Sequence, residues 1–124
     1  MVASLASACS SSPTAPTIPL DRQFTLMPGE RVRVADTSIS VQFERVDGDS
    51  RCPADAICIL GGDAQVRISV HDDGRAHHYA LHTSDLAPVR HDGLTIALVE
   101  LAPYPFSARP IAPADYRVTL RVNR

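Results

Sequence analysis

The stretch of residues 64–82 constrains the fold of this chain more than any other part of its sequence. Apolar and polar residues alternate strictly through its first half, which is typical of a half-buried β-strand. The apolar set is Ala64, Val66, Ile68 and Val70. Asp73-Gly74 follows, and this pair tolerates the positive φ angles of a type I′ turn. The sequence therefore predicts a β-hairpin with a two-residue turn at Asp73-Gly74.

The register implied by this turn agrees with the apolar pattern. The pairs on one face are Val70 with His77, Ile68 with Tyr79 and Val66 with Leu81, and those on the other include Ser69 with His78 and Gln65 with His82. Apolar residues meet on the first face, with His77 as the exception next to the turn. A slip by one residue would reverse the facing of every side chain, so the agreement supports the hairpin.

Short alternating runs separated by turn residues continue along the chain, without any helical period longer than one turn. Besides the hairpin they predict five strands, at residues 23–27, 30–35, 38–46, 93–101 and 115–123. The chain has three Phe, three Tyr and no Trp, so Val, Ile and Leu must form the core. We expect an antiparallel β-sandwich of about seven strands, immunoglobulin-like in general architecture, with a small closed barrel as the alternative.

Length, charge and hydropathy limit the classes of function. A chain of 124 residues fits one domain. Its 12 basic and 14 acidic residues give a formal charge of -2, which provides no field to attract nucleic acid or anionic lipid headgroups. The sequence has no apolar run of about 18 residues or more, so any membrane attachment would be covalent or peripheral.

Residues 1–20 differ sharply in composition from everything that follows. Small residues lead up to Cys9, and Ser, Thr and Pro dominate from there to Pro19. Such a segment has too little apolar surface to offset its own ordering entropy. We expect a flexible tether over residues 10–22 and a folded domain over residues 23–124.

The tract Leu5-Ala6-Ser7-Ala8-Cys9 resembles the lipobox of bacterial lipoproteins, with Ala6 where that motif prefers Leu. In such proteins a signal peptidase cuts before the cysteine, which then carries lipid. The resemblance implies that residues 1–9 are a truncated lipoprotein signal segment and that Cys9 is lipidated. The protein would be exported and anchored in the bacterial cell envelope, at the outer membrane or facing the periplasm. The alternative is a cysteine without a role in an unstructured tail.

Cys52 and Cys58 remain once Cys9 is set aside. In an exported protein, two cysteines six residues apart indicate a disulfide rather than a zinc site, which usually needs a closer spacing and two further ligands. Closing a loop of this size stabilises the fold by roughly 2.4 kcal/mol in the chain-entropy model. The disulfide would fix the loop between two strands.

The run Asp49-Ser50-Arg51-Cys52-Pro53, followed by Cys58, Gly61 and a strand from Ala64, resembles a family of small bacterial lipoproteins without an assigned biochemical activity. That family has DSRCP, a short gap, C-x-W-x-G and a strand. The tracts 101–105 and 115–120 also look like its final strands, so the resemblance covers roughly Phe24 to Val122. Leu60 stands where Trp is usual. The resemblance implies the compartment and the fold, and it implies no mechanism.

Two loops carry candidate binding residues. Asp49 and Arg51 could form a charge-assisted hydrogen bond, and the carboxylates of Asp47-Gly48-Asp49 could face a cation. A purely structural turn is the favoured interpretation. In the proline-rich segment 101–115, Tyr104 or Phe106 could be a pre-organised contact for a partner. The favoured interpretation is that these aromatics fold back over an open end of the sandwich.

The histidines and nucleophiles do not form a recognisable catalytic or metal motif. His78 and His82 share a strand face but lie about 13 Å apart, too far to bind one ion. Alternation puts His71 and His77 on opposite faces, and His91 is assigned to a loop. No serine lies in a G-x-S-x-G elbow. We expect no enzymatic activity, no metal and no cofactor.

These observations favour a non-enzymatic lipoprotein of the cell envelope that acts as a binding or accessory module. Its expected partners are a membrane, through the lipid anchor, and a protein of the envelope, with no nucleic acid, and we expect a monomer. One alternative is a secreted or envelope inhibitor of a hydrolase such as a protease or lysozyme. A metal-binding domain is the other.

Overall fold

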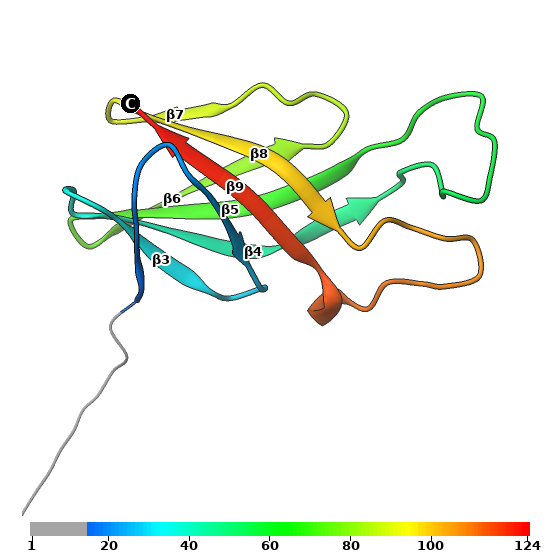
Figure 1. Cartoon of the computed structure of the whole chain (residues 1–124), viewed down its shortest axis with the longest axis horizontal. Helices are drawn as coiled ribbons and strands as arrows, with labels where there is room; N and C mark the ends of the chain where they lie inside the picture. Colours follow the sequence, from blue (N-terminus) through cyan, green and yellow to red (C-terminus); the bar gives the residue numbers. More distant parts are fainter. Residues whose placement is uncertain (1–14) are drawn as a thin grey trace, which may run out of the picture.

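The computed structural model describes residues 15–124, and these residues form two β-sheets (Figure 1). The five-stranded sheet has the order β1-β3-β4-β5-β6, and the four-stranded sheet has the order β2-β9-β8-β7. The strands are β1 (Thr17–Ile18), β2 (Gln23–Leu26), β3 (Arg31–Val34), β4 (Ile39–Asp49), β5 (Ala64–Asp72), β6 (Arg75–His82), β7 (Val89–His91), β8 (Leu94–Ala102) and β9 (Arg117–Asn123). The helical element η1 is one 3-10 turn at Pro113–Asp115. Cys9 and the rest of the lipobox-like tract lie outside the described residues.

The predicted β-sandwich is confirmed, because the two sheets pack face to face around one core. The closed barrel considered as the alternative does not form within residues 15–124. Within the described residues, all strand pairs are antiparallel except β1 with β3. The described chain has nine strands instead of about seven, and the two additional strands, β1 and β7, are the shortest.

The predicted hairpin is confirmed in turn type and register. Asp73 and Gly74 have φ angles of 50° and 76°, and Val66 lies opposite Leu81 as expected. A second turn of the same type joins β7 to β8 at Asp92-Gly93, with φ angles of 48° and 80°. The assignment of His91 to a loop was therefore wrong, because three residues are too few for strand periodicity to reveal β7.

The core consists mainly of Val, Ile and Leu, as the composition predicts. Phe43 is completely buried, and Tyr116 is the other aromatic residue that the core buries. The residues expected to point inward are buried throughout, and they are Val32, Val34, Ile39, Val41, Phe43, Ala64, Val66, Ile68, Val70, Leu94, Ile96, Leu98, Tyr116, Val118, Leu120 and Val122. Strict alternation therefore identified both inner faces.

Two residues of the segment that the sequence assigned to the tether belong to a sheet. Thr17 and Ile18 pair in parallel with Arg33 and Val34. The backbone N–H of Arg33 also donates to the carbonyl of Pro16 at 2.8 Å. A strand of two residues is too short to show an alternating pattern. The surrounding prolines favour an extended chain whether or not that chain pairs with a sheet. Residues 17–18 are therefore part of the folded domain rather than of the expected tether.

The three longest connections lie together at one end of the sandwich, to the right in Figure 1. They join β4 to β5 (residues 50–63), β6 to β7 (83–88) and β8 to β9 (103–116). The strand register is consistent with this position of the first connection, because Asp49 at the end of β4 pairs with Ala64 at the start of β5. We call these three connections the loop end. They hold most of the candidate residues.

Candidate functional site

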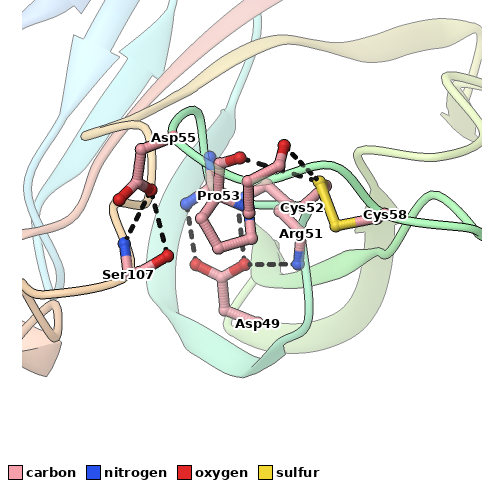
Figure 2. The surroundings of a disulfide bond; sticks show 8 residues. Asp49, Arg51, Cys52, Pro53, Asp55, Cys58 and Ser107 are labelled. Carbon is pink, nitrogen blue, oxygen red and sulfur yellow. Dashed lines mark hydrogen bonds and ion pairs between the residues drawn. A yellow bond between two sulfur atoms is a disulfide. The ribbon is translucent and has the colours of Figure 1, made fainter.

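A largely buried ion pair lies where β4 enters the loop end (Figure 2). Arg51 Nε donates to Asp49 Oδ1 at 2.8 Å and Arg51 Nη2 donates to Asp49 Oδ2 at 2.7 Å, which is the bidentate geometry. The two side chains are only 8% and 12% exposed. The charge-assisted hydrogen bond expected from the sequence is confirmed.

The same pair ties the two sheets together. Arg51 Nη1 donates to the carbonyl of Leu101 at 2.8 Å, and Nη2 donates to the carbonyl of Pro103 at 3.0 Å. The hydroxyl of Tyr116, just before β9, donates to Asp49 Oδ2 at 2.9 Å. One guanidinium and one carboxylate thus connect the end of β4 to the end of β8 and the start of β9. We call Asp49, Arg51 and Tyr116 the polar clamp.

The polar clamp shifts the pKa of each of its members. Burial alone would raise the pKa of Asp49, but hydrogen bonds from Arg51 and Tyr116 lower it below its ordinary value. The hydrogen bond with Asp49 raises the pKa of Arg51 against the effect of burial. Burial and the bond to Asp49 raise the pKa of Tyr116 to about 12. Asp49 is therefore ionised at neutral pH, with its charge matched by Arg51.

Ser50 closes the base of the β4–β5 connection. Its backbone N–H donates to the carbonyl of Asp63 at 2.7 Å, and its hydroxyl accepts from the N–H of Asp63 at 3.0 Å. Gly62 passes so close to this contact that a Cβ on it would lie 1.4 Å from the carbonyl oxygen of Ser50. No local pattern in the sequence indicates this requirement, which only the folded path of the chain reveals.

The predicted disulfide between Cys52 and Cys58 is present, with Cα atoms 6.0 Å apart. Its loop contacts the β8–β9 connection at two points. The N–H of Ala54 donates to the carbonyl of Pro105 at 2.8 Å, and Asp55 Oδ1 accepts from the N–H of Ser107 at 2.9 Å (Figure 2). The DSRCP run therefore has structural roles: an ion pair from Asp49 and Arg51, a loop closure by Ser50 and a disulfide from Cys52.

Asp63 organises the neighbouring β6–β7 connection. Its Oδ2 lies 2.7 Å from His82 Nδ1, and its Oδ1 accepts from the N–H and the hydroxyl of Ser84 at 3.0 and 2.9 Å. Burial would raise the pKa of this carboxyl group, but the bonds from His82 and Ser84 outweigh that effect and lower it to about 2. The two connections are thereby held against each other.

Large apolar side chains are exposed at the loop end. Ile57 in the disulfide loop and Ile59 directly after it are fully exposed, and Leu60 is 81% exposed. Tyr104 and Phe106 are 61% and 48% exposed. The expectation that these two aromatics cover the open end is therefore wrong. Instead the Arg51 guanidinium lies 5.7 Å from the centre of the Tyr104 ring and holds it at the surface.

Two grooves flank the polar clamp. One, of about 360 Å³, lies beside β8 and is lined by residues including Leu98, Val99, Leu101, Leu86 and Tyr104. The other, of about 480 Å³, lies under the proline-rich connection and includes Phe106, Arg109 and Ile111. The first has the more apolar lining. Sequence reasoning did not identify either groove, since each combines residues from separate connections.

The histidines are engaged in local contacts. His78 Nδ1 lies 2.6 Å from Glu44 Oε2, and His71 contacts Arg31 and Gln42. His91 packs against His77 with ring centres 4.7 Å apart and lies 3.1 Å from Asp72 Oδ2. Within residues 15–124, His, Cys, Asp and Glu side chains do not gather in threes that could hold a metal ion.

Asp47 likewise contacts cationic side chains, with Arg45 Nε at 2.6 Å and Arg67 Nε at 3.0 Å. These hydrogen bonds lower the pKa of Asp47. The sequence indicated a turn at Asp47-Gly48-Asp49, but these residues belong to β4, and both carboxylates pair with arginines of this chain. The helical turn within residues 15–124 lacks the length and apolar character needed to cross a bilayer.

Comparisons with protein-family models, with curated proteins and with solved structures give no match to this chain. The resemblance carried by the DSRCP run stays a prediction.

Proposed function

We propose that this protein is a non-enzymatic binding module of the bacterial cell envelope and that the loop end is its recognition surface. The exposed apolar side chains of the loop end carry this proposal. They are Ile57, Ile59, Leu60, Leu86, Tyr104 and Phe106. Single exposed apolar residues are normal on protein surfaces, whereas several at one end favour a binding site.

The bracing of these residues supports recognition rather than disorder. The disulfide, the polar clamp and the Ala54 and Asp55 contacts fix the loops before any partner arrives. A pre-organised loop loses less conformational entropy on binding, so more of the contact energy remains as affinity. Exposed aromatic residues such as Tyr104 are typical of the few positions that dominate binding energy.

The experiment that tests this proposal is affinity purification from a solubilised envelope fraction with the purified domain. We expect Ile57→Ser combined with Ile59→Ser, and separately Tyr104→Ala, to reduce recovery of the bound protein at least tenfold, about 1.4 kcal/mol. Met27→Ser is the matched control, because Met27 is 48% exposed but lies outside the loop end. Equal recovery with all variants would remove the loop end as the recognition surface.

Inhibition of a hydrolase is the second candidate, and the disulfide loop favours it. Ile57 is fully exposed within the loop closed by Cys52 and Cys58, and Ile59 is fully exposed directly after it. A rigid, exposed apolar loop of this kind fits the concave, mostly apolar cleft of an enzyme. Residual activity of lysozyme and of a set of proteases, measured with increasing amounts of the domain, tests this candidate. Full activity at excess inhibitor would exclude those enzymes as targets.

A further inference from the structure

The outer edge of β8 is only partly covered. β7 pairs with Leu94 to Ile96, whereas β8 continues to Ala102. Within residues 15–124, the edge from Leu98 onward has β9 on one side and no strand on the other. An edge of this kind presents backbone N–H and C=O groups that can pair with another chain.

Alternation along β8 identifies the backbone groups concerned. His91 and Leu94 flank the two-residue turn and form its closing pair, so every second residue, Ile96 and then Leu98, directs its N–H and C=O toward the β7 side. β7 does not extend to Leu98. Farther on, the Leu101 carbonyl receives the Arg51 guanidinium, which ends the free part of the edge.

The free edge borders the 360 Å³ groove described above. Leu98 to Leu101 line it consecutively, together with Thr83, Leu86 and the Gly61-Gly62 turn. A register shift between Leu98 and Glu100 places Val99 and Glu100 both at the surface. Such a bulge turns side chains away from the regular alternation. The groove therefore combines backbone hydrogen-bonding groups with apolar walls.

The charge in the groove lining that has no ion-pair partner among the described residues is acidic. Arg51 and Glu100 are the charged residues of the lining, and Arg51 is neutralised by Asp49. Glu100 is exposed, as is Asp85 next to Leu86. A basic side chain on an occupant would meet complementary charge here, whereas anionic lipid headgroups would be repelled.

We propose that this groove binds an extended segment of a partner protein, which adds as a strand beside β8 and places a basic side chain at Glu100. This inference rests on the proposed function and names the partner chemistry of the same surface. In such strand addition the backbone bonds supply affinity, and alternate side chains entering the groove supply specificity. Leu86 and Val99 would contact the apolar side chains of the segment.

The test is a titration of the isotope-labelled domain with the peptide acetyl-Lys-Val-Lys-Leu-Lys-Val-Lys-amide, followed by amide NMR shifts. We expect saturable shifts at Leu98 to Leu101 and at Leu86, with a dissociation constant below about 1 mM. The same peptide N-methylated at every residue keeps its side chains but has no backbone N–H to donate on either edge, and it should bind at least tenfold more weakly. Equal binding of both peptides, or the absence of shifts at β8, would overturn the proposal.

Charge variants, a protein dilution series and a titration with vesicles complete the experiment. Glu100→Lys should weaken the basic peptide about tenfold, while Glu30→Lys, at a distant site, should leave it unchanged. Shifts at β8 that depend on protein concentration without peptide, or that require vesicles of anionic lipid, would identify a second copy or a bilayer as the occupant and overturn the proposal. If the peptide fails while affinity purification still depends on Ile57 and Tyr104, the strand-addition inference fails and the proposed function stands.

Discussion

At the scale of single residues, the polar clamp illustrates how a buried charge depends on its partner. Removing Arg51 would leave the carboxylate of Asp49, 12% exposed, without its counter-ion. We expect Arg51→Met to lower the free energy of unfolding by about 3 kcal/mol. Urea denaturation measures this change.

The control for this prediction is the pair of variants combined. Asp49→Leu with Arg51→Met removes both charges, and we expect it to cost less than the sum of the single variants because no uncompensated charge remains. Tyr116→Phe removes one hydrogen bond and should cost about 1 kcal/mol. Additive losses in the double variant would show that the two charges do not interact energetically.

Gly62 and Gly61 offer a matched comparison of two adjacent glycines. A Cβ on Gly62 would lie 1.4 Å from the Ser50 oxygen, whereas a Cβ on Gly61 meets nothing within 4 Å. We expect Gly62→Ala to destabilise the fold by about 3 kcal/mol or more, since backbone must move to relieve the clash. Gly61→Ala should change the unfolding free energy by less than about 1 kcal/mol. Thermal melts of both variants that coincide would contradict this account.

The pH dependence of stability should report on Asp63. Its pKa is about 2 in the folded protein and ordinarily 3.8, so the folded state favours the ionised form. The stabilisation is therefore complete above about pH 4 and is lost as the pH falls toward 2. We expect Asp63→Asn to flatten the acid limb of the unfolding profile, while Asp85→Asn, at an exposed position nearby, leaves it unchanged. The same acid limb in both variants would assign the loss to other carboxylates.

Sequence reasoning identified some residues of the candidate site and missed others for physical reasons. Asp49 and Arg51 are two positions apart, so their ion pair is a local contact that the sequence can reveal. Tyr116 reaches the same carboxylate from 67 positions away, and Gly62 is required only because Ser50 passes beside it. Contacts of this kind depend on the packing of the two sheets, which no local pattern contains.

At the scale of elements, strand periodicity was informative in proportion to strand length. The long strands β4, β5 and β8 were predicted together with their buried faces. β1 and β7, with two and three residues, are too short to complete an alternating pattern. Asp92-Gly93 has the same turn chemistry as Asp73-Gly74 and is the signal by which β7 could have been found.

The disulfide loop is the element whose constraint is simplest to remove. Replacing Cys52 and Cys58 together by serine should lower the free energy of unfolding by roughly 2.4 kcal/mol in the chain-entropy model. Because the strands beside the loop keep their own pairing, we expect the core to remain folded and the loss to appear mainly as faster amide exchange in residues 50–63. Core amides that exchange equally fast would show that the fold itself requires the bond.

At the scale of the whole molecule, attachment and recognition are proposed to occupy different parts of the chain. Lipid on Cys9 would hold the protein at a membrane, with β1 as the first strand of the domain. We expect the full-length gene product to fractionate with membranes and Cys9→Ser to release it without changing thermal stability. Labelled fatty acid that is incorporated equally into both forms would refute lipidation at Cys9.

The register places β1 far from the disulfide loop. Thr17 pairs with Arg33, Arg33 with Ser40, and Ser40 with His71 near the Asp73-Gly74 turn. β4 then continues for nine residues from Ser40 to Asp49, about 30 Å, before the loop begins. The exposed apolar residues therefore lie at the opposite end of the sheet from the strand through which an anchored chain would enter.

The position of β1 at the start of the domain has a mechanical consequence. If the protein is pulled while Cys9 is held in a membrane, the load reaches the domain through β1, which pairs with β3 at two residues, Thr17 and Ile18. A bond from the N–H of Arg33 to the carbonyl of Pro16 and the packing of Ile18 and Leu20 against the core add to this attachment. A two-residue pairing separates at lower force than the longer strands of the core, because regions with few contacts open first. Release of residues 15–20 would add up to about 20 Å of chain while the core stayed closed. β1 would then detach from β3 under tension, lengthen the connection to the membrane, and pair with β3 again when the tension ends.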